Sequence, residues 1–239
     1  MNFSFYSSAV GAQAMQNKLD VASNNLSNLN TTGYKAKNGY FTDLIYKNIK
    51  NVEGDNGNVT YGAGTRLKKV DTNFEQGSFT LTDMPLDYAI NGDGFFALYD
   101  PATQTRTYTR DGSFQLSLQQ NGQFYITNSD GKWVLDQNGN PIVANDVEAE
   151  HPIGVFVFQQ KNGMVSVGNN EFMAIDKNGT PIASNGNDGL LVRGAIEDSN
   201  VDFTKEIADM LQIQNVYQMS LKMVQTTDEI ENTVNSLRW

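Results

Sequence analysis

Apolar residues recur at alternating intervals of three and four at both ends of the chain, and this spacing predicts two long terminal helices. It is typical of the contact face of a coiled coil. Each stripe needs a partner, and we expect the two to pair with each other. The N-terminal stripe is Phe5, Ser8, Ala12, Met15, Leu19, Ala22, Leu26 and Leu29, and the C-terminal stripe is Phe203, Ile207, Met210, Gln214, Tyr217, Leu221 and Val224.

Glycine and proline are concentrated between these two ends. Of the 21 glycines, only Gly11 and Gly33 lie in the first 33 residues, and none follows Gly194. All five prolines fall between Pro85 and Pro181. Because both residue types interrupt helices, the ends are expected to be helical and the middle not.

The middle of the chain has the features of an antiparallel β domain. Short alternating or aromatic runs at 113–118, 123–127, 154–159 and 190–196 predict strands. Asn-Gly pairs favour two-residue hairpins, because both positions tolerate positive φ. The predicted fold class is therefore mainly β with terminal α-helices. The pairs begin at Asn91, Asn121, Asn138, Asn162, Asn178 and Asn185.

These signals divide the chain into four segments. We expect an N-terminal helix of a coiled-coil core domain at 1–35, a connecting segment at 36–70, an antiparallel β domain at 71–198 and a C-terminal helix of the core domain at 199–239. In the connecting segment, Phe41, Leu44 and Ile45 favour a short continuation of the helical pattern, and 53–58 is a polar, glycine-rich loop.

Local signals mark where the helices end. Gly33 can adopt the left-handed conformation that closes a helix. Ser199 and Asp202 have the spacing of a capping box ahead of Phe203. Past Val224 the three-and-four spacing continues but is displaced by one residue. This predicts a single helix whose later turns pack against a different neighbour. The residues of this continuation are Ile230, Val234 and Leu237.

Composition excludes several classes of function. A net charge of −10 argues against nucleic acid or an anionic membrane as partner, because phosphate binding needs clustered Lys and Arg. The absence of cysteine excludes disulfides and thiolate chemistry. We expect no cleaved signal peptide, because the first residues lack a basic start and an apolar core. The apolar runs are far shorter than the roughly 20 residues of a membrane helix, so no membrane insertion is expected.

The sequence gives little support for a catalytic or a metal-binding site. His151 is the single histidine, so it can support neither a histidine metal cage nor, without a nucleophile motif, a triad. Asp136, Asn138 and Asn140 have the spacing of a calcium loop, but Val147 stands where the bidentate glutamate is needed, and a turn is the better interpretation. We therefore expect no catalytic, cofactor or metal site. An acidic pair like that of a cell-wall hydrolase remains an alternative among the 27 acidic residues.

Three separate motifs, in order, resemble bacterial flagellar axial proteins, the family of rod and hook subunits. One resembles the N-terminal signature of that family, one the start of its β domain and one its C-terminal signature. They lie at Leu19 to Lys35, at Pro85 to Phe96 with Tyr108 to Phe114, and at Ser199 to Glu206 with the helix through Tyr217 to Glu229.

The resemblance implies a basal-body rod subunit that polymerises into a helical tube. Its partners would be copies of itself, other rod and hook proteins, and the flagellar type III export apparatus. It would act outside the cytoplasmic membrane, and its proximal or distal position in the rod stays open. A hook-type or other exported filament subunit, an adhesin and a phage-tail component are the further alternatives. The expected assembly interface comprises both stripes except Ser8, together with Asn24, Asn25 and Asn28.

Overall fold

The computed structural model describes all residues except 1–2, 45–46, 50–58, 145, 185–190 and 238–239. The chain forms two compact units. The first, called here the helical unit, comprises Met1–Ser27, Lys37–Asp71 and Asp202–Trp239. The second, the β unit, comprises Asn28–Ala36 and Thr72–Val201. The chain thus passes from one unit to the other four times.

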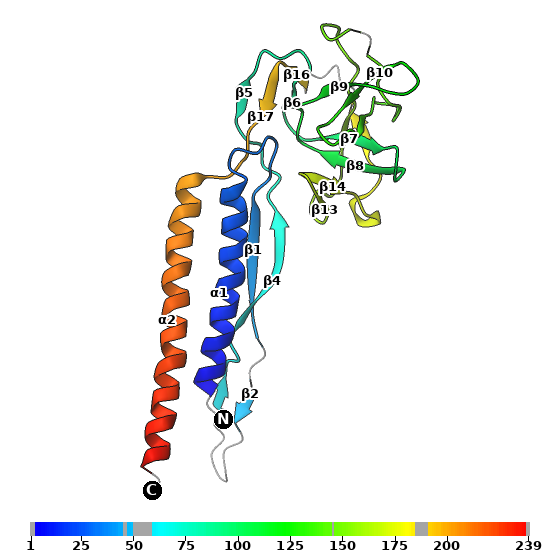
Figure 1. The fold of residues 1–239 in the computed structure, drawn as a ribbon. Coiled ribbons are helices and arrows are strands. Elements are labelled where there is room, and N and C mark those ends of the chain that lie inside the picture. The colour runs from blue at the N-terminus through cyan, green and yellow to red at the C-terminus, as the bar shows by residue number, and fades with distance from the viewer. Residues whose placement is uncertain (1–2, 45–46, 50–58, 145, 185–190, 238–239) are drawn as a thin grey trace. The chain divides into compact units, whose positions relative to one another are not determined.

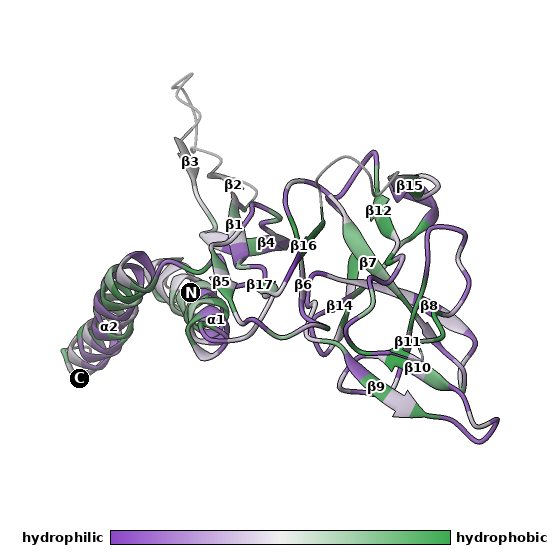
Figure 2. Cartoon of the chain, turned by 90° about the horizontal axis from the view of Figure 1, so that it is seen from above, coloured by the Kyte–Doolittle hydropathy of each residue, from purple (hydrophilic) through white to green (hydrophobic). Residues whose placement is uncertain are grey.

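In the helical unit, two long antiparallel helices pack side by side. α1 spans Phe3–Ser27 and α2 spans Phe203–Ser236. A two-stranded ribbon of β1 (Lys37–Asp43) and β4 (Thr65–Thr72) lies beside α1, so that α1 runs between α2 and the ribbon (Figures 1 and 2). A short antiparallel pair, β2 (Lys47–Ile49) and β3 (Val59–Tyr61), belongs to the same unit.

The segment expected to connect the two domains is largely strand. The predicted helical continuation through Phe41 and Leu44 is wrong, because Phe41 lies in β1. Gly39, Tyr40 and Thr42 explain the difference, since glycine disfavours a helix while aromatic and β-branched residues favour a strand. Ile45 and the polar loop 53–58 lie outside the described residues.

The helix ends also differ in detail from expectation. α1 stops at Ser27, before the left-handed Gly33. Gly33 instead allows close backbone contact, because a Cβ there would lie 2.6 Å from the Arg110 carbonyl carbon. The N-cap of α2 is Asp202, whose side chain accepts from the Lys205 N–H at 3.1 Å. Ser199 accepts from Val201 one turn too early to cap the helix.

The β unit is built around one antiparallel sheet with the strand order β13-β14-β8-β7-β11-β10-β9, and β12 pairs with both β7 and β15. Two further ladders, β5–β17 and β6–β16, complete the unit. The strands are β5 (Phe79–Leu81), β6 (Tyr88–Ile90), β7 (Phe95–Asp100), β8 (Thr105–Thr109), β9 (Gln115–Leu118), β10 (Phe124–Thr127), β11 (Trp133–Val134), β12 (Val155–Val157), β13 (Val165–Gly168), β14 (Glu171–Met173), β15 (Ile182–Ser184), β16 (Leu191–Arg193) and β17 (Ala195–Glu197).

Strand β7 is buried on both faces and separates two apolar cores. Phe96 and Leu98 enter one core with Tyr88 and Phe114, whereas Phe95 and Ala97 enter the other. This follows from the strand period of two acting on an uninterrupted apolar run. Full burial of a large apolar side chain contributes about 1.5 to 3 kcal/mol, so these cores give the β unit its stability.

Some of the described Asn-Gly pairs join strands that pair with each other, and others form turns between strands that do not pair. Asn121 begins the turn between the paired strands β9 and β10, and Asn138 lies in the turn that leads to the bridge between Leu135 and Pro141. The pairs at Asn91 and Asn162 join strands that do not pair with each other, and the pair at Asn178 closes a short 3-10 helix. Asn185 lies outside the described residues.

The hairpin between β13 and β14 was not predicted. Asn169 and Asn170 form its turn, with φ values of 46° and 59°. Two positive φ values match the turn whose twist suits a hairpin. Asparagine tolerates this conformation better than most residues, so the missed signal was an Asn-Asn pair in place of Asn-Gly.

A buried ion cluster holds together the segments through which the chain enters and leaves the β unit. Glu197, on β17, accepts from the Lys35 ammonium at 2.7 Å and from the Arg110 guanidinium at 3.0 Å. The backbone N–H of Gly77 donates to the same carboxylate at 2.8 Å. Burial lowers the pKa of Lys35, while the adjacent Glu197 raises it in part. Three separate segments therefore converge on one carboxylate.

Replacing Glu197 by Gln should destabilise the β unit by about 3 to 5 kcal/mol, because two buried cations would lose their counter-charge. Urea unfolding followed by Trp fluorescence would measure this loss, since Trp133 lies in the β unit. Glu148→Gln is the matched control, as Glu148 is exposed. A loss no larger than that of the control would contradict the assigned role.

Candidate assembly surface of the helical unit

The fully buried apolar side chains of α1 are small, whereas α2 buries the larger Ile213. Ala12, Ala14 and Ala22 are the buried apolar residues of α1. Gly11 lies opposite Ser220, because a Cβ on this glycine would lie 3.8 Å from the serine Oγ. Such small residues let the helices approach closely, but they bury little apolar surface.

The expected stripe residues divide by burial. The partly buried ones on the helices are Met15, Leu19, Leu26, Ile207, Met210, Tyr217 and Val224. Those classed as exposed are Phe5, Asn24, Phe203, Gln214 and Leu221. Asn28 and Leu29 follow α1 and belong to the β unit, where Leu29 packs against Tyr34, Ala36 and Val201.

At two turns of α2, the residue that faces α1 lies one position before the residue predicted from the spacing. Ile213, not Gln214, is buried, and Ser220 is more buried than Leu221. Thr227 continues this face and is also buried. At the second of these turns, Ser220 lies opposite Gly11. Sequence spacing could not distinguish these neighbouring positions.

Asn25 joins the three elements of the helical unit near the end of α1. Its amide nitrogen donates to the Lys37 carbonyl and to the Glu206 carboxylate, both at 2.9 Å. Its amide oxygen accepts from the Lys37 N–H at 2.8 Å. The residue is only 1% exposed. Within the described residues, Asn25 therefore serves the fold of its own chain, in contrast to its expected place at a contact with a neighbour.

A small groove lies at the same end of the helical unit, with a volume of about 290 Å³. Charged side chains from α1, α2 and β1 surround it, among them Lys18, Lys37, Lys205 and Asp209. In the described part of the chain, His, Asp and Glu side chains nowhere gather in a group of three that could hold a metal ion.

A second apolar stripe runs along α2. The predicted assembly interface contains none of its residues. Its residues are separated by three, four or seven positions, so they share one face of the helix. Most are more than half exposed, whereas Ile213 and Thr227 on the side of α2 that faces α1 are buried. The stripe comprises Val216 (40% exposed), Met219 (68%), Met223 (52%), Ile230 (60%), Val234 (56%) and Leu237 (81%).

The end of α2 extends beyond the start of α1. The contacts of Asn25 with Glu206 and of Gly11 with Ser220 set the antiparallel register. In this register Phe3 reaches α2 near Asp228. The remaining eight residues of α2, up to Ser236, extend about 12 Å further at 1.5 Å per residue. Within the described residues, no part of α1 covers this end.

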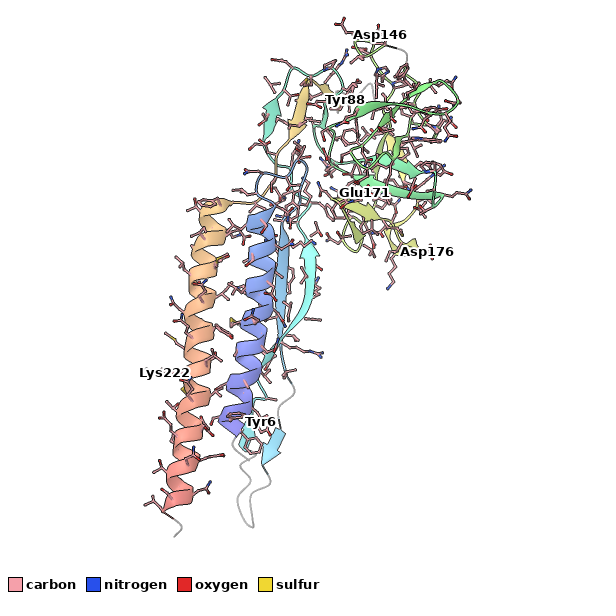
Figure 3. The ribbon with its side chains drawn as sticks, viewed as in Figure 1. Tyr6, Tyr88, Asp146, Glu171, Asp176 and Lys222 are labelled. Atoms are coloured by element: carbon pink, nitrogen blue, oxygen red, sulfur yellow. The ribbon has the colours of Figure 1, made fainter. Side chains whose placement is uncertain are left out.

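The first turn of α1 is also apolar and open to solvent. Phe3 and Tyr6 are 52% and 51% exposed, and Phe5 is 36% exposed. The rings of Phe5 and Tyr6 pack edge to face, 5.7 Å apart. Figure 3 shows Tyr6 at this end of the unit and Lys222 on α2. Both helices thus present apolar surface beyond the face that they share.

The weak catalytic and calcium candidates lie in the β unit. His151 lines a cavity of about 310 Å³ with Tyr88, Glu150 and Arg193. Its Nε2 has no hydrogen-bond partner among the described residues, unlike a triad base that bonds to its nucleophile. Asp136 accepts from the backbone N–H groups of Asn138 and Asn140, so this acidic motif forms a turn.

Taken together, these features define a protein with a pair of long terminal helices, exposed apolar side chains on both of them, and a β unit, and comparison with known proteins identifies the family. Three family models match in order: "Flagella basal body rod protein" over residues 5–35, "Flagellar hook protein FlgE/F/G D1 domain" over 89–197 and "Flagellar basal body rod FlgEFG protein C-terminal" over 192–237. Together they cover both helices and most of the β unit.

Relatives match over nearly the whole chain. The flagellar basal-body rod protein FlgG of Buchnera aphidicola subsp. Schizaphis graminum is 32% identical, over 98% of this chain and 99% of its own. FlgG of Bacillus subtilis is 32% identical over 98% of both chains. FlgG of Caulobacter vibrioides is 30% identical over 96% of this chain and 97% of its own. The chain belongs to the flagellar basal-body rod protein family.

The resemblance in the three sequence motifs is thereby confirmed, as is the fold class of antiparallel β-structure with terminal helices. The protein is a structural subunit of the flagellar basal-body rod and serves motility. It assembles with other rod and hook components. None of the described helices combines the length and apolar character needed to cross a bilayer.

Replacing Asn25 by Asp should destabilise the helical unit by about 1 to 3 kcal/mol, because a buried donor is lost and a carboxylate is placed beside Glu206. Circular dichroism at 222 nm during thermal unfolding would report the loss. Adding Glu206→Gln should restore part of the stability, since the Gln amide can donate to the new carboxylate, whereas the Lys37 carbonyl still lacks its donor. The matched control is Asn24→Asp, one residue away and exposed. Equal effects at both positions would contradict the role of Asn25.

Proposed function

We propose that this rod subunit polymerises with copies of itself through α1 and α2 into a helical tube that forms part of the drive shaft. The observation that carries the proposal is the second apolar stripe of α2, which is open to solvent. The expected interface residues Phe5, Phe203 and Leu221 are also exposed, and Phe203 and Leu221 lie on a different side of α2 from this stripe. Neighbouring copies would cover them.

The energetics favour assembly over an independent helical pair. The alanine and glycine contacts between α1 and α2 contribute little apolar burial, whereas each large side chain of the second stripe contributes about 1.5 to 3 kcal/mol when fully buried. Covering this stripe between subunits would therefore add apolar stabilisation that the single chain lacks. A non-closing contact repeated from copy to copy generates a helical array.

The chain acts as a mechanical and not a catalytic component. Family membership supports this view, because the relatives are named as rod proteins. The flagellar type III apparatus exports the chain without cleavage. In support, cleavage within residues 1–27 would remove Ala12 and Ala22 from the contact face with α2.

Replacing Ile230 and Val234 by Asp should abolish polymerisation, because two carboxylates would enter the apolar contact between copies. Sedimentation of the purified protein, and swimming zones of cells that carry only the variant, would measure the loss. Asn232→Asp with Asn235→Asp is the matched control, since it adds the same charge to exposed positions of the same turns. Normal polymers from the Ile230 and Val234 variant would refute the proposed surface.

A further inference from the structure

The net charge of the chain is divided very unequally between the two units. The helical unit contains ten Lys and Arg residues against eleven Asp and Glu, a net charge of −1. The β unit contains seven against sixteen, a net charge of −9. Copies of the β unit must repel one another in a polymer unless opposite charge lies between them.

The β1–β4 ribbon carries exposed basic side chains that could supply this charge. Arg66 and Lys68 lie on β4, and both are exposed. Neither forms an ion pair with the described residues, whereas the adjacent Lys69 is paired with Asp71 and lies over the Tyr40 ring. Val70 and Tyr40 are 42% and 48% exposed on the same ribbon. The ribbon therefore combines unpaired positive charge with uncovered apolar area.

The β unit carries a matching acidic segment at residues 146–150. Asp146, Glu148 and Glu150 alternate along it, and all three are exposed and form no ion pair with the described residues. Figure 3 shows Asp146 on the outside of the β unit. The Arg193 guanidinium donates to the carbonyls of Val147 and Glu148 at 3.1 and 2.8 Å. The backbone of the segment is thus held in place by residues of its own unit.

We propose that Arg66 and Lys68 on the β1–β4 ribbon of one copy bind the acidic segment 146–150 of a second copy. Each partner presents charges separated by one residue, Arg66 and Lys68 on one side and Glu148 and Glu150 on the other. The contact rests on the proposed self-assembly and adds to it a second, polar contact between units of different copies. Such charge pairs fix register and accelerate association more than they add affinity.

A charge-exchange experiment tests this contact. Arg66→Glu with Lys68→Glu should slow polymerisation at low salt at least tenfold, because both sides would then be acidic. Glu148→Lys with Glu150→Lys should be similarly slow, and the fourfold variant should recover at least half of the original rate. Polymerisation of the unchanged protein should slow as salt rises, since exposed ion pairs are screened.

The control is Arg106→Glu with Lys177→Glu, which changes the net charge equally at exposed positions of the β unit. The rate should change little in this variant. An equal loss in the control, or no recovery in the fourfold variant, would overturn the proposal. Circular dichroism of each monomer would establish that the variants are folded, and surface substitutions of this kind should leave the melting temperature within a few degrees.

Cross-linking provides a second, independent measurement. The chain has no cysteine, so Lys68→Cys with Glu148→Cys introduces the only thiols. Oxidation during assembly should give a ladder of covalent oligomers, whereas a disulfide within single chains would overturn the proposal. The test is separable from that of the helical surface, because the Ile230 and Val234 variant should fail at every salt concentration and should not recover with exchanged charges.

Discussion

The buried carboxylate of Glu197 is the interaction on which the rest of the β unit depends. The chain crosses between the units four times, so separate segments must be fixed where the β unit begins and ends. Lys35, Gly77 and Arg110 bring three of these segments to one side chain. An apolar contact could hold the segments as firmly, but it would not define which atoms meet.

Asn200 has a similar role a few residues further along the chain. Its amide oxygen accepts from the Ala36 N–H at 2.7 Å, and its amide nitrogen donates to the carbonyls of Asn73 and Glu75, both at 2.9 Å. In the helical unit Asn25 makes comparable bonds to β1 and α2. In each unit, polar side chains fix the crossing segments, and the apolar residues are left to form cores or contact surfaces.

The sequence predicted the elements better than the contacts. The distribution of glycine and proline was sufficient for the terminal helices and the β-rich middle, because it reflects backbone freedom alone. The faces of α2 were harder, since Ile213 and Gln214 are adjacent and only the packing of the folded chain shows that Ile213 is the buried one. The ion cluster could not be predicted, because Lys35 and Glu197 are 162 residues apart and nothing local marks either as buried.

Asn25 shows that the sequence also cannot separate contacts within a chain from contacts between chains. It was expected to bond an adjacent subunit because its side chain flanks the apolar stripe, and the bonds observed lie within its own chain. Met219 and Met223, which the sequence analysis did not identify, are left exposed together with the predicted continuation at Ile230, Val234 and Leu237. A pattern of apolar spacing identifies which helix faces need a partner. Only the structure shows which of these helix faces are already covered within the same chain.

The two units therefore differ in how much of their apolar surface is covered within one chain. The β unit contains two aromatic cores and a buried ion cluster, so its stabilising contacts are satisfied within one chain. The helical unit buries three alanines and Ile213, and it leaves Met219, Ile230 and Leu237 more than half exposed. A subunit with this division can fold its β unit first and gain most of its remaining stability on joining the rod. In the proposed self-assembly, the charge of −9 on each β unit would oppose the association of copies.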